Sequence, residues 1–123
     1  MQREMTLNLG GKDYGLVANW KASLDISQQV IDPLVMARDA AVAVHFAENN
    51  IPYASKFEFT VENTARILHC ALRANGHDLT LDDVGEAVVS DGIIVHVGNA
   101  EKFITLLVSN GSGEIEGGKA TGK

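Results

Sequence analysis

Residues 60–88 read T-V-E-N-T-A-R-I-L-H-C-A-L-R-A-N-G-H-D-L-T-L-D-D-V-G-E-A-V, and this stretch decides how the chain folds. Apolar residues recur at helical spacing in its first half, at Val61, Ala65, Leu68 and Leu72. Gly76 follows as a stop signal, and Thr80 with Asp83 three residues later has the pattern of a capping box. The stretch therefore predicts a helix over about 60–75, a short acidic turn and a second helix over about 81–90.

A β-hairpin is predicted before this stretch, over residues 5–18. Apolar and polar residues alternate on both sides of Gly10-Gly11, the apolar ones being Met5, Leu7, Leu9, Tyr14, Leu16 and Ala18. Glycine tolerates the positive φ that a tight hairpin turn requires. Because an isolated hairpin is marginal in water, we expect its apolar face to rest on helices.

A long apolar helix is predicted over about 33–49, after a weaker and shorter one from Trp20 to Val30. Asp32 can cap the long helix, and proline suits its first position. A narrow stripe of this helix holds Leu34, Arg38, Ala41, His45 and Glu48, while apolar residues occupy the rest. A central position in the domain is favoured, since alanine-rich faces allow close packing. The alternative is a surface closed by another subunit or partner.

The C-terminal third is less decided by its pattern. The β-branched run at residues 93–97 predicts either a third short strand or a buried connector. Asn99 is expected to cap a last helix over about 100–109. The predicted fold class is α+β and mainly α, with the hairpin packed on a bundle of about four helices. One globular domain over 1–109 would precede a flexible Gly-rich tail, 110–123.

Composition excludes several classes of function. The chain has 123 residues and a net charge of -6, which disfavours binding to a phosphate backbone, and we therefore expect no nucleic-acid partner. It has no apolar run of the roughly 20 residues that a membrane span needs. Its first residues lack the apolar core of a secretion signal, so we expect a cytoplasmic protein.

No catalytic, cofactor or metal site is indicated. Cys70 is the only cysteine and lies within a predicted helix, so a buried thiol is expected. The four histidines, at 45, 69, 77 and 96, fall in different segments without zinc-like spacing. His69 shares a face with two arginines and is expected to be solvated. The acidic turn lacks the ligand spacing of a calcium loop. We expect no enzyme and no cofactor.

Three motifs in order resemble the small tail assembly chaperones of siphophages and gene transfer agents. The motifs are Gly11-Lys12-Asp13-Tyr14 in the hairpin, A-L-R-A-N-G at residues 71–76, and L-T-L-D-D-V-G at residues 79–85. The resemblance covers roughly residues 6–108. The segment 35–59 is longer and more apolar than the usual outline of the family.

This resemblance implies a non-enzymatic protein of virion morphogenesis that keeps the tape measure protein soluble while the tail tube assembles, and that is absent from the mature particle. The implied partner is the tape measure protein, with contact to the tail tube protein and self-association left open. A structural tail tube or completion component is the alternative, followed by a small metal-dependent enzyme. The candidate partner-binding residues lie on the long helix and the aromatic segment after it: Val35, Val42, Phe46, Phe57 and Phe59.

Overall fold

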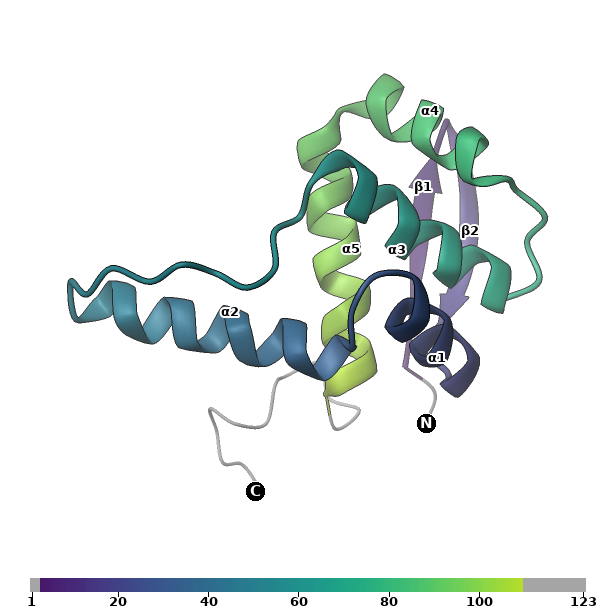
Figure 1. The fold of residues 1–123 in the computed structure, drawn as a ribbon. Coiled ribbons are helices and arrows are strands. Elements are labelled where there is room, and N and C mark those ends of the chain that lie inside the picture. Colours follow the sequence, from purple (N-terminus) through teal and green to yellow (C-terminus); the bar gives the residue numbers. More distant parts are fainter. Residues whose placement is uncertain (1–2, 110–123) are drawn as a thin grey trace.

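The computed structural model describes residues 3–109, which form a two-stranded hairpin followed by five helices (Figure 1). The elements are β1 (Glu4–Leu9), β2 (Lys12–Val17), α1 (Trp20–Gln29), α2 (Pro33–Glu48), α3 (Val61–Ala74), α4 (Leu81–Asp91) and α5 (Ile93–Val108). The α+β, mainly helical class is confirmed. The weakly patterned segment after Trp20 forms a regular helix, α1, which brings the number of helices among the described residues to five. The tail predicted at 110–123 lies outside the described residues.

The hairpin agrees with its prediction. β1 and β2 are antiparallel, and Leu9 pairs with Lys12, so that Gly10 and Gly11 alone form the turn. Both glycines have positive φ, 61° and 82°, as the tight turns that match strand twist require. Met5, Leu7 and Leu9 are buried on one face of β1, which rests on the helices.

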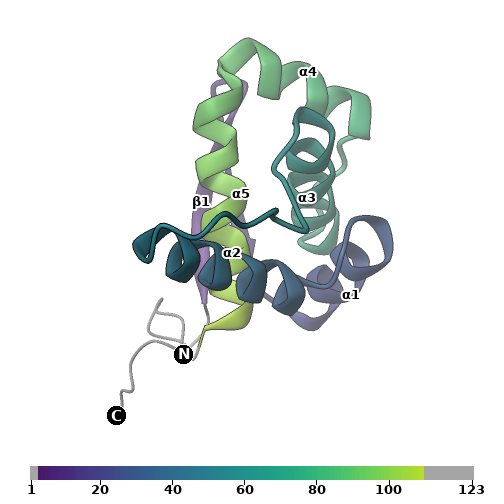
Figure 2. The same cartoon turned by 60° about the vertical axis from the view of Figure 1, so that its left-hand side comes forward.

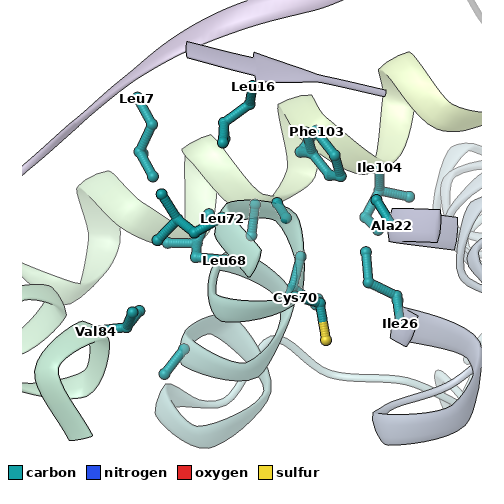
Figure 3. Packing of buried hydrophobic residues seen from close by; sticks show 14 of the residues in the cluster. Leu7, Leu16, Ala22, Ile26, Leu68, Cys70, Leu72, Val84, Phe103 and Ile104 are labelled. Carbon is teal, nitrogen blue, oxygen red and sulfur yellow. The ribbon is translucent and has the colours of Figure 1, made fainter. Parts of the chain in front are cut away.

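The central helix of the core is α3. Seven of its residues are buried: Thr64, Ala65, Ile67, Leu68, Cys70, Ala71 and Leu72. It covers the predicted range, and Gly76 follows as the predicted stop with a φ of 82°. Its start is capped by the Thr60 side chain, which accepts from the Asn63 amide. Figure 3 shows Leu7 and Leu16 of the hairpin directed toward Leu68 and Leu72 of α3. The helix predicted from residues 60–75 is therefore the central element of the hydrophobic core.

The predicted capping box starts α4. The Asp83 amide donates to Thr80 Oγ1 at 3.0 Å, and the Thr80 amide donates back to Asp83 Oδ2 at 3.1 Å. His69 of α3 contacts the loop that precedes α4: its Nε2 donates to the Leu79 carbonyl at 2.9 Å, and its ring is half-buried. The expectation that His69 is solvated is therefore wrong, because a neighbouring loop carbonyl takes the place of water.

Residues 93–97 are helical, so the predicted third strand or connector is wrong. Gly92 has a φ of 112° and separates α4 from α5, which begins at Ile93. The residues of α5 that face the protein, His96, Ala100 and Phe103, recur every three or four positions, and this helical period prevails over β-branched propensity. Asn99 lies inside α5 and caps nothing; its amide donates to His96 Nδ1 at 3.0 Å.

Polar contacts connect distant parts of the chain. The Asn75 side chain accepts from the Val17 amide at 2.9 Å and donates to the Val17 carbonyl at 3.2 Å, joining α3 to β2. The Gly10 amide donates to Asp91 at 2.8 Å, which attaches the hairpin turn to the end of α4. Arg3 donates to the carbonyls of Ser109 at 2.6 Å and Leu107 at 3.3 Å. The hairpin is therefore fixed along its whole length.

Candidate partner-binding surface

Helix α2 projects from the body of the protein. Its three buried residues, Pro33, Met36 and Asp39, all lie in its first half. Figures 1 and 2 show that half crossing α5, while the other end reaches outward beside the chain that returns to α3. The favoured expectation of a central helix is therefore wrong, since α3 takes that position. A helix with apolar residues on all sides is expected to be contacted on several sides. The sequence pattern is the same whether those contacts come from the same chain or from a partner.

The chain that returns from the tip of α2, residues 49–60, is called the return segment here. Asn50 adopts a φ of 57°, a left-handed conformation that asparagine tolerates, and the Ile51 amide donates to the Phe46 carbonyl at 2.8 Å. These contacts end the helix and reverse the chain. The return segment then lies along α2 without forming a strand or helix of its own.

Asp39 holds the return segment against α2. Its carboxylate accepts hydrogen bonds from the Tyr53 hydroxyl at 2.6 Å, the Lys56 amide at 2.9 Å and the Phe57 amide at 3.3 Å. The sequence interpretation missed this role. The available signal was a single carboxylate on the apolar side of an alanine-rich helix, because such a group is buried only where donors satisfy it.

These hydrogen bonds change the acid–base behaviour of both side chains. The Lys56 amide and the Tyr53 hydroxyl, which favour the ionised carboxylate, hold the pKa of Asp39 below its ordinary value. The hydrogen bond to Asp39, together with burial, raises the pKa of Tyr53 above its ordinary value. The pair is therefore an anionic acceptor and a neutral donor over the physiological range of pH.

Aromatic rings cover the inner side of the return segment. Phe46 and Tyr53 meet edge to face with ring centroids 5.0 Å apart, and Phe57 and Phe59 do so at the same distance. All four side chains are half-buried. Part of the surface of three predicted partner-binding residues is therefore buried in intramolecular contacts; these residues are Phe46, Phe57 and Phe59.

Two predicted residues are more open. Val35 and Val42 are 37% and 39% exposed, and their separation of seven residues puts them on one flank of α2. Val44, 57% exposed, points to the other flank, and Ile51 at the tip is 48% exposed. Val44 and Ile51 were not among the predicted residues, and neither was Leu34, which belongs to the narrow stripe of the helical wheel and is 50% exposed.

A groove runs between α2 and α5 on the Val44 side. It has a volume of about 240 Å³ and is lined by Met36, Ala37, Ala40, Phe59, Glu101, Ile104, Thr105 and Val108. Alanines on α2 leave it open, and Phe59 of the return segment lines it together with Met36. The predicted set is thus divided between two places: Val35 and Val42 share a flank, whereas Phe59 belongs to the groove.

The cysteine and one histidine of the chain, Cys70 and His96, lie in the interior and away from α2. Cys70 is buried in α3, and burial, reinforced by the Asp25 carboxylate, raises the pKa of its thiol to about 11. The His96 ring is fully buried, with Nε2 donating to Asp91 at 2.8 Å and Nδ1 accepting from Asn99. The pKa of Asp91 is lowered by the hydrogen bond from the Gly10 amide and by His96. These contacts connect the hairpin turn, α4 and α5.

Within residues 3–109, no group of three or more His, Cys, Asp and Glu side chains is placed to hold a metal ion. No helix in the same range has the length and apolar character that a membrane crossing requires. No family model, curated protein or solved structure matches the chain. The candidate surface is therefore described from its own geometry: an apolar helix with two open flanks, braced by a segment that Asp39 holds in place.

Proposed function

We propose that this protein is a tail assembly chaperone that binds the tape measure protein and keeps it soluble while the tail tube forms. The observation that carries the proposal is the projecting helix α2, where Val35, Val42 and Val44 are open to solvent. The order of the three sequence motifs agrees with it. The chaperone would act in the cytoplasm of the bacterial host and leave before the particle is complete.

The geometry suits a long helical client. A helix with an apolar stripe can lay that stripe against α2, and its larger side chains can enter the groove between α2 and α5. The exposed valines are scattered over two flanks, so that several client segments of similar character would fit. The net charge of -6 would keep the complex dispersed once the apolar surfaces are covered.

Co-expression with the tape measure protein encoded nearby tests this proposal. The chaperone should raise the soluble yield of that protein and co-purify with it. An unchanged yield together with no co-purification would exclude the function. Detection of this chain by mass spectrometry in purified particles would instead favour the structural tail component.

A further inference from the structure

A second groove lies on another part of the surface, between the N-terminal half of α3 and the length of α4. Its volume is about 640 Å³. Val61 and Ala65 form the α3 side, and the α4 side is a helical stripe that includes Gly85 and Val89. Val61 is 41% exposed and Val89 is 60% exposed, so that this groove offers apolar surface to solvent.

Gly85 is the least expected residue of this groove. Glycine inside a helix destabilises it by about 0.5–1 kcal/mol relative to alanine. Nothing in the fold requires glycine here, because a Cβ at position 85 would meet no atom within 4 Å and the backbone does not have positive φ. What the missing side chain does provide is depth in the middle of the groove.

The rim of the groove is acidic. Glu62, Asp82 and Glu86 line it, and no lysine or arginine does. Arg66 pairs with Glu62 at 2.9 Å and so neutralises part of the charge on the α3 side of the rim. Asp82 and Glu86 have no cationic partner within salt-bridge distance among the described residues. An apolar floor between carboxylates is complementary to an apolar ridge between cations.

We infer that the groove between α3 and α4 is a docking site for a basic amphipathic helix of a partner protein. Apolar side chains of that helix would lie over Gly85 between Val61 and Val89, and its flanking Lys or Arg side chains would face Asp82 and Glu86. This inference does not rest on the proposed function of α2, because the two surfaces share no lining residue.

The test uses the full chain and two synthetic helical peptides, one with leucine and lysine faces and one with leucine and glutamate faces. Binding is followed by NMR chemical shifts of the labelled protein and by calorimetry. The lysine peptide should shift the amides of residues 61–65 and 81–90, and its affinity should fall as salt is raised, since screening shortens the reach of exposed charges. The glutamate peptide should not bind there.

Gly85→Leu is the decisive variant, because it fills the groove while improving helix propensity. Gly98→Leu is the matched control: Gly98 also lies inside a helix, its Cβ would also meet nothing within 4 Å, and it does not line the groove. Gly85→Leu should weaken binding about tenfold or more, as loss of a central contact does. Gly98→Leu should leave the affinity unchanged.

Glu86→Gln should reduce both the affinity and its dependence on salt, whereas Glu4→Gln on β1 should change neither. Equal binding of both peptides, shifts centred on another surface, or an unchanged affinity in Gly85→Leu would each overturn the inference. Shifts of the groove amides upon dilution of the protein alone would also overturn it, because they would identify the occupant as a second copy of this chain.

Discussion

The hydroxyl of Tyr53 donates a 2.6 Å hydrogen bond to Asp39, 14 residues earlier in the chain, and thereby fixes the return segment to α2. The backbone amides of Lys56 and Phe57 donate two further hydrogen bonds to the same carboxylate. The contact determines the shape of the projecting part of the molecule, because residues 49–60 form no strand or helix of their own.

The attachment of the return segment should depend on pH. The pKa of Asp39 in the folded chain lies below its ordinary value of 3.8. Its stabilising contribution is therefore present above pH 3.8 and is lost as the pH falls through the lowered value. Amide hydrogen exchange should show the protection of Lys56 and Phe57 declining in that window. In Asp39→Asn, which cannot ionise, protection should be lower throughout and should not decline further; an identical profile would contradict the role of Asp39.

The double variant Val35→Ser with Val42→Ser should reduce the co-purification of the tape measure protein. Each side chain is more than half buried, at 37% and 39% exposed, so each substitution should lower the free energy of unfolding by about 1 kcal/mol. Leu24→Ser on α1 is the matched control, since Leu24 is 39% exposed, as Val42 is. A pull-down and a urea titration measure the two effects. Equal loss in both variants would mean that general surface hydrophobicity, and not this flank, binds the client.

Cys70 should resist thiol reagents at neutral pH in the folded protein and react fully after denaturation. Burial raises its pKa from 9.0 to about 11, so the reactive thiolate is scarce and shielded. Because the unfolded thiol ionises first, the stabilising contribution is present below pH 9.0 and is lost as the pH rises toward about 11. Labelling kinetics measure the reactivity. Rapid labelling of the native chain would show that α3 opens far more readily than its packing indicates.

Alanine substitutions at two glycines should have opposite effects. Gly76→Ala forces a Cβ into a residue with a φ of 82° and should lower the free energy of unfolding by about 1–2 kcal/mol. Gly85→Ala should raise it by about 0.5–1 kcal/mol, because the new Cβ meets open space in a helix interior. Urea titrations under matched conditions measure both. A loss of stability in Gly85→Ala would show that the groove is closed in solution.

The sequence is most informative where short-range rules determine structure. The Gly10-Gly11 turn, the Asp32 cap, the stop at Gly76 and the Thr80 capping box all depend on neighbours within a few residues, and each forms as predicted. The prediction of a strand or connector at residues 93–97 was wrong because β-branched residues adopt a helix when their helical spacing buries apolar side chains against the rest of the protein.

The position of α2 could not be predicted, because an apolar helix has the same sequence whether it is covered by its own chain or stands open. Val35 and Val42 could be selected as candidates only because they are apolar residues outside the narrow stripe of this helix. Asp39 could not be connected to Tyr53, since the partner of a buried carboxylate lies across a turn whose path is set by Asn50. The groove beside Gly85 depends likewise on how closely two helices approach.

The contacts of Arg3 with Leu107 and Ser109 also bear on how the chain folds during synthesis. They join residues more than 100 positions apart, so the base of the hairpin cannot be secured until the last helix has left the ribosome. Until then the part of the β1 surface that α5 covers stays exposed. A nascent chain halted before α5 should therefore be protease-sensitive at its very beginning, and synthesis of α5 should protect the hairpin in a single late step.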